Sequence, residues 1–181
     1  VNNRNQVCNA GLAIAALAVW EKAPILCRDV LESSIARNRL AMESLYAPDG
    51  IYDEGAVYWS YGTTFEIALL DALESILGTD YGLSEVPGFD RTPYFEINMF
   101  SSTGREQDFF NYADTEDSLT LPGCIWYFVR RSGDSGFLWP VREIYEQPSL
   151  LCDKYCDDRL AFITLYEAVH AQINKIAEPD A

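Results

Sequence analysis

The sequence has little positive charge and almost no histidine. It carries 13 Lys and Arg residues against 28 Asp and Glu, a formal net charge of -15, and one histidine, His170. This balance argues against a nucleic-acid partner, because a phosphate backbone requires a basic surface. Attraction to anionic lipid is disfavoured for the same reason. An acidic polysaccharide remains compatible if the binding site itself is locally basic or rich in hydrogen-bond donors.

The sequence also lacks a metal-binding pattern. Its cysteines are odd in number, and none of them forms a C-x-x-C pair. A single histidine adds little to these potential ligands. We therefore expect no zinc site and no other cofactor. Buried or half-buried free thiols are the favoured interpretation, and one disulfide remains open. The five cysteines are Cys8, Cys27, Cys124, Cys152 and Cys156.

No apolar run is long enough to cross a bilayer. The longest, "GLAIAALAVW" at 11–20, falls short of the roughly 20 residues that a spanning helix requires, so membrane insertion is not expected. No signal peptide is visible, and the opening "VNNRNQVCNAG" reads like the interior of a longer protein. We therefore expect a fragment whose targeting segment lies upstream.

Apolar periodicity predicts one all-α domain over residues 1–181. Apolar residues make up 49% of the chain, enough for a core. The Ala-rich segment 7–21 is apolar nearly all round, which predicts a helix buried on most faces. A long irregular connection is expected at 79–118, with a short helix near 93–100. The other expected helices span 25–46, 63–78, 121–134, 137–147 and 157–178.

Several helix ends are marked by local signals. "TTFE" has the form of a capping box, with Thr63 as N-cap and Glu66 three residues later. Gly78 and Gly133 are placed to end helices, and Pro140 suits a first helical turn. Buried Ala-rich helices alternating with more amphipathic ones predict paired inner and outer layers, as in an (α/α) toroid or a part of one.

Three strings together resemble a known enzyme family. They are "NNRNQVCNAGLAIAALA" (2–18), "MESLYAPDGIYDEGAVYWSYGT" (42–63) and "FNYAD" (110–114). In this combination the chain resembles the heparinase II/III-like polysaccharide lyases. The resemblance implies the helical toroid portion of such an enzyme, an acidic polysaccharide as partner, and a secreted or periplasmic location.

The resemblance also implies a chemistry, β-elimination of a uronate polymer. An amide neutralises the uronate carboxylate, a base removes the weakly acidic C5 proton, and an acid protonates the departing glycosidic oxygen. Carried over by position, Tyr61 is the catalytic acid/base, Tyr58 assists it, and Asn5 and Asn3 hold the carboxylate. Arg4 stands where relatives commonly have an aromatic residue, and no histidine lies near the first string.

Further residues are candidates for substrate binding, and each has a structural alternative. Trp59 could stack on a sugar or anchor the core. Asn111 and Asp114 could bind sugar hydroxyls or fix their loop. Asn3 could instead cap a helix, and Glu54 is a further binding candidate with no evident structural task.

Two other classes of function remain open. The first is a catalytically silent helical domain that binds glycans or is purely structural. The second is a glycoside hydrolase that uses Asp49 and Glu54 as its carboxylate pair. For Asp49, turn formation in "PDG" is the favoured interpretation.

Overall fold

The structure is a computed structural model that describes residues 2–99, 110, 113 and 124–141. Over these residues the chain is helical and contains no strand, which confirms the all-α prediction. The elements are α1 (Asn3–Ala18), α2 (Pro24–Leu45), α3 (Ala56–Leu77), α4 (Thr92–Asn98), α5 (Ile125–Ser132) and the 3₁₀ helix η1 (Ser135–Val141). The expected helix at 157–178 lies outside the described residues.

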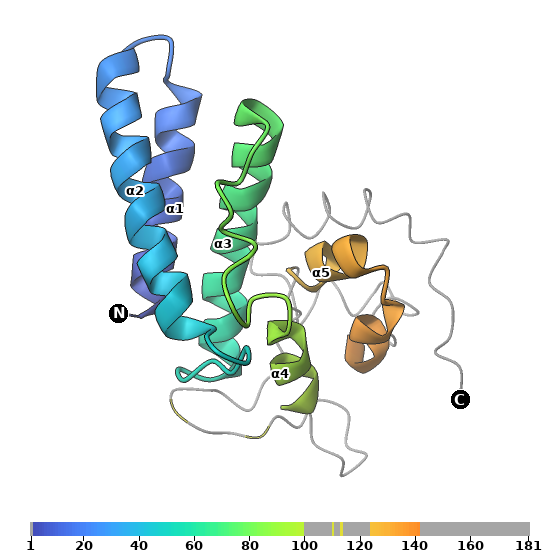
Figure 1. Cartoon of the computed structure of the whole chain (residues 1–181). Coiled ribbons are helices and arrows are strands. Elements are labelled where there is room, and N and C mark those ends of the chain that lie inside the picture. Colours follow the sequence, from blue (N-terminus) through green and yellow to red (C-terminus); the bar gives the residue numbers. More distant parts are fainter. Residues whose placement is uncertain (1, 100–109, 111–112, 114–123, 142–181) are drawn as a thin grey trace, which may run out of the picture.

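Among the described residues, three long helices form the body of the fold. α1 and α2 are an antiparallel hairpin, and α3 runs beside them in the direction of α1, so α1 and α3 begin at the same end of the molecule (Figure 1). Pro24 opens α2, where its missing N–H costs no hydrogen bond and its fixed φ suits the first turn. The candidate site lies at this end of the molecule, where α1 and α3 both begin.

The first helix is less buried than its sequence predicts. Its Ala10 and Ala13 face the core with no exposed surface. Leu12, however, is 54% exposed, and Ala15 and Ala18 are exposed as well. The expectation of burial on most faces was wrong within the described residues, because α2 and α3 cover one side of the helix.

α3 begins eight residues before the position that the capping box predicts, since its N-cap is residue 55 and not 63. Gly55 is its N-cap, with φ of 89°, a conformation that side chains rarely adopt. Thr63 lies inside the helix, fully buried, and its hydroxyl bonds the hydroxyl of Tyr46 at 2.9 Å. The prediction of Thr63 as N-cap was therefore wrong, whereas the predicted end at Gly78 is confirmed.

The connection after α3 is more ordered than predicted. Residues 79–91 form successive tight turns, in which Asp80 accepts the backbone N–H groups of Gly82 and Ser84 at 2.9 and 3.0 Å. Leu83 and Phe89 of this segment enter the core. The short helix predicted near 93–100 is confirmed as α4, and most of the remaining connection, up to 118, lies outside the described residues.

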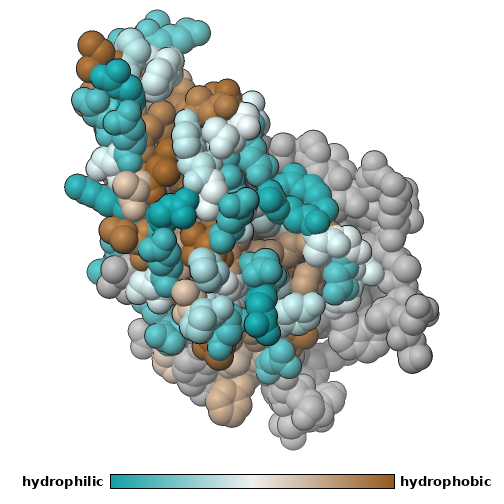
Figure 2. Space-filling model, in the orientation of Figure 1, coloured by the Kyte–Doolittle hydropathy of each residue, from teal (hydrophilic) through white to brown (hydrophobic). Residues whose placement is uncertain are grey.

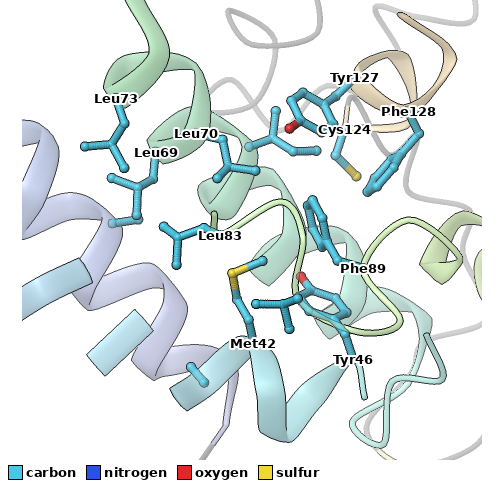
Figure 3. Packing of buried hydrophobic residues seen from close by; sticks show 14 of the residues in the cluster. Met42, Tyr46, Leu69, Leu70, Leu73, Leu83, Phe89, Cys124, Tyr127 and Phe128 are labelled. Atoms are coloured by element: carbon cyan, nitrogen blue, oxygen red, sulfur yellow. The ribbon is translucent and has the colours of Figure 1, made fainter. Parts of the chain in front are cut away.

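Aromatic rings join the later elements to the long helices. Phe89 packs on Tyr46 at 5.1 Å between ring centroids and on Phe128 at 5.2 Å (Figure 3). α5 ends at Gly133 in a left-handed conformation, as predicted. Pro140 lies in the 3₁₀ helix η1 instead of an α-helix, and residues of the expected helix beyond 141 are outside the described part.

Two ion pairs tie α5 to α3. Arg130 bonds Asp71 at 2.7 Å, and Arg131 bonds Glu74 at 2.8 Å. Figure 2 shows one face of the molecule, on which hydrophilic residues cover much of the described part and are interrupted by hydrophobic ones. None of the described helices is both long and apolar enough to span a bilayer.

Candidate functional site at the start of the first and third helices

A hydrogen bond joins the first turn of α1 to the residue before the N-cap of α3. The backbone N–H of Asn3 donates to Glu54 Oε2 at 2.7 Å. This carboxylate therefore satisfies one of the N–H groups left free at the start of α1 and faces the positive end of the helix dipole. Glu54, for which the sequence offered no structural task, has one here.

The asparagines at the start of α1 have three different environments. Asn2, not Asn3, is the N-cap residue, and its backbone N–H donates to Asn5 Oδ1 at 3.3 Å. Asn3 is 4% exposed, and its Nδ2 has no hydrogen-bond partner among the described residues. Asn5 is exposed. The interpretation of Asn3 as the helix cap was therefore wrong, because the preceding residue, Asn2, is the N-cap.

Tyr58 and Tyr61 both lie in the first two turns of α3 and are half-buried. Tyr58 packs against the edge of the core. Tyr61 makes an edge-to-face contact with Phe65, with 5.2 Å between ring centroids and 75° between ring planes. Both residues are partly exposed, so neither is fully enclosed in the core.

Trp59 is a core residue in this structure. Its side chain is fully buried, and its Nε1–H donates to Thr92 Oγ1 at 2.6 Å. Thr92 in turn donates to the Gly50 carbonyl at 2.7 Å, which fixes the turn before α3. The structure supports the core-anchor alternative and leaves no ring face for stacking on a sugar.

Gly62 brings α3 close to the start of α1. A Cβ at this position would lie 2.6 Å from Tyr52 Oη, 2.7 Å from Gln6 Oε1 and 3.3 Å from Asn3 Cβ. A methyl group there would force the Tyr52 and Gln6 side chains to shift, so glycine suits this approach. Because Gly62 directly follows Tyr61, the contact places the tyrosine turn beside the asparagine turn.

A buried hydrogen-bond network lies directly beneath this contact. Gln6 Nε2 donates to Tyr46 Oη at 2.8 Å, and Tyr52 Oη donates to Gln6 Oε1 at 2.7 Å. Asn38 Nδ2 lies 2.7 and 2.6 Å from the two oxygens of Glu66. All members are fully buried, and they come from α1, α2, α3 and the segment before α3: Gln6, Asn38, Tyr46, Tyr52, Thr63 and Glu66.

Burial changes the acid–base properties of this network. It raises the pKa of Glu66 to about 7, although hydrogen bonds from Asn38 and Gln6 oppose the rise. Burial also raises the pKa values of the Tyr46 and Tyr52 phenols well above their ordinary range. These two phenols therefore stay protonated and serve as structural hydrogen-bonding groups.

The remaining predicted residues fall outside this contact. Asp49 Oδ1 accepts the backbone N–H of Ile51 at 3.3 Å, the turn-forming role that its sequence favoured. Asn111 and Asp114 lie outside the described residues. Within the described part of the chain, no three His, Cys, Asp or Glu side chains gather where they could hold a metal ion.

Sequence reasoning missed the network residues. Gln6 belongs to the first string and Glu66 to the expected capping box. Neither was predicted to be buried, because polar residues in a helix are usually solvent-exposed. The available signal was the clustering of Tyr46, Tyr52 and Gly62 inside one recognised string. That string contains both the candidate site and the packing that supports it.

A separate pocket of about 170 Å³ lies between the turns before α4 and the end of α5. None of the predicted site residues lines it. Its described walls are Ser84, Phe89, Asp90, Tyr127, Phe128, Arg131, Ser132 and Phe137.

Comparison of the chain with models of known protein families and with curated proteins finds no match.

Proposed function

We propose that the chain is the helical part of a polysaccharide lyase that cleaves a uronate-containing polysaccharide by β-elimination. The observation that carries the proposal is the close approach of the asparagine turn of α1 to the tyrosine turn of α3 through Gly62. Together with the resemblance of three sequence strings to heparinase II/III-like lyases, this approach supports a shared site.

Each residue has a defined part in the proposed reaction. Asn5 and Asn3 donate hydrogen bonds to the uronate carboxylate, which makes the C5 proton easier to remove. Tyr61, with Tyr58 beside it, transfers the proton between C5 and the glycosidic oxygen. The bond from the ring to that oxygen breaks as the double bond forms, so no water enters the products.

The exposure of these side chains supports the assignment. Asn5 is exposed and Tyr61 is half-buried, so both can reach a polymer at the surface. Asn3 is buried, and its Nδ2, which has no partner among the described residues, donates to the substrate once the first turn of α1 opens. Trp59 is left out of the proposed substrate contacts because it is enclosed.

The hydrolase alternative receives less support. Its two carboxylates already have local bonds, since Glu54 accepts from Asn3 and Asp49 accepts from Ile51. A silent glycan-binding domain remains the second candidate, because the first string lacks a histidine. The toroid arrangement and a secreted or periplasmic location belong to the lyase proposal.

One assay separates the three functions. The full-length protein is incubated with uronate polymers, and ultraviolet absorbance and new reducing ends are followed together. A lyase gives both signals, because its product carries an unsaturated sugar. A hydrolase gives reducing ends without absorbance, and a silent domain binds without either signal.

A further inference from the structure

Glu66 is a fully buried carboxyl group whose hydrogen-bond partners carry no charge. It lies in the middle of α3 and accepts from Asn38 of α2 and, at 3.4 Å, from Gln6 of α1. Both donors are neutral amides, so no positive charge among the described partners balances a carboxylate. A group in this situation favours its protonated form.

The titratable groups facing Glu66 come from two directions. Tyr46, at the end of α2, and Tyr52, in the segment before α3, are both within electrostatic range of its carboxyl group. Cys124, next to α5, acts on Tyr46. α1 contributes the neutral Gln6, and α3 itself contributes Thr63, which bonds Tyr46.

The present orientation of the Asn38 amide suits an ionised Glu66 carboxylate. Its Nδ2 lies within 2.7 Å of both Glu66 oxygens, as an ionised carboxylate requires. Its Oδ1 is buried and has no hydrogen-bond partner among the described residues. A protonated Glu66 would need an acceptor for its O–H, and the nearest side chain able to accept is this same amide, turned over.

We propose that Glu66 and Asn38 form a proton-binding switch in the centre of the three-helix core. When Glu66 is ionised, Asn38 donates to it through Nδ2. When Glu66 takes up a proton from water, the Asn38 amide turns by half a rotation and accepts the new O–H through Oδ1. Asn38 is the donor in the ionised state and the acceptor in the protonated state. In both states a hydrogen bond joins α2 to α3.

The switch has a consequence for α1. Gln6 donates to Glu66 and also bonds Tyr46 and Tyr52. Protonation weakens the first of these bonds, because a neutral carboxyl is a poorer acceptor than a carboxylate. Gln6 lies one turn after Asn3, so the proton on Glu66 is linked to the packing of the first turn of α1. The pKa of about 7 places this exchange near neutrality.

Nuclear magnetic resonance tests the switch on the folded protein without any substrate. The ¹³C shift of the Glu66 carboxyl and the side-chain amide shifts of Asn38 are followed from about pH 5 to about pH 9. We expect both to change with one shared midpoint near 7. A Glu66 carboxyl that stays ionised across this range, or Asn38 shifts that ignore its titration, would overturn the proposal.

Two variants sharpen the test. Glu66→Gln carries a permanent N–H donor, so its Asn38 amide should keep the low-pH shifts at every pH. Glu32→Gln, an exposed residue of α2, should leave the titration of Asn38 unchanged. If Glu66→Gln does not fold, the shared titration of Glu66 and Asn38 in the unaltered protein still tests the proposal. None of these results depends on lyase activity.

Discussion

The backbone N–H of Asn3 lies 2.7 Å from the Glu54 carboxylate, which ties the start of α1 to the residue before the N-cap of α3. Both residues belong to strings that the sequence singled out for a shared chemistry. Their contact gives those distant strings a common location at one end of the molecule (Figure 1).

Removing the Glu54 carboxylate should loosen the first turn of α1. We expect Glu54→Ala to lower the free energy of unfolding by about 1 kcal/mol, because a helix N–H loses its acceptor and the dipole loses its anion. Denaturant unfolding measures the change. Asp53→Ala, at the exposed neighbouring position, should stay within about 0.5 kcal/mol of the unaltered protein. Equal effects of the two substitutions would contradict this role.

Gly62 and Gly11 should respond in opposite directions to the same substitution. Gly62→Ala places a methyl group against Tyr52 and Gln6, and we expect a loss of about 2 kcal/mol. Gly11→Ala lies in the middle of α1 with open space around its Cβ, so it should gain up to about 1 kcal/mol of helix stability. Thermal or denaturant unfolding of the pair provides the measurement, and a Gly62→Ala protein as stable as Gly11→Ala would refute the close approach.

Stability should fall as pH rises through neutrality. The folded-state pKa of Glu66 is about 7, above its ordinary 4.5, so the folded protein binds the proton more tightly than the unfolded chain. Its contribution is complete below about pH 4.5 and is lost as pH passes 7. The loss is on the order of 3 kcal/mol. Glu96, whose pKa burial also raises, acts in the same direction.

Urea unfolding at a series of pH values measures this dependence. Glu66→Gln should reduce the slope, leaving the part that Glu96 contributes, and be the more stable protein above neutral pH. Glu43→Gln, at an exposed position of α2, should keep the slope. A protein whose stability rises steadily from about pH 5 to about pH 8 would contradict the buried, uncompensated state of Glu66.

The sequence predicted the helical class and several helix ends because the signals for these features are local. A glycine after an apolar stripe predicts a helix end, and this prediction is correct at Gly78 and Gly133, which both adopt left-handed conformations. The start of α3 was missed because "TTFE" satisfies the capping pattern, whereas Gly55 provides the actual entry through its positive φ. Thr63 instead lies inside α3, where its hydroxyl bonds the hydroxyl of Tyr46.

The site was harder to predict than the fold. A motif can indicate that Asn3, Asn5 and Tyr61 act together, but only packing shows that Trp59 is enclosed while Tyr61 is half-exposed. The role of Glu54 and the hydrogen bonds of the Gln6 side chain depend on contacts between residues forty or more positions apart, such as Tyr52 with Gln6. No periodicity within one helix encodes such contacts.

The most direct test of the central claim is the rate of unsaturated product formation by Tyr61→Phe in the full-length protein. We expect kcat to fall at least about a hundredfold while KM and the unfolding midpoint stay nearly unchanged, because only the proton-carrying oxygen is lost. Tyr81→Phe, which removes an exposed phenol from the turn after α3, should keep full activity. A Tyr61→Phe protein that forms product as fast as the Tyr81→Phe control would contradict the account.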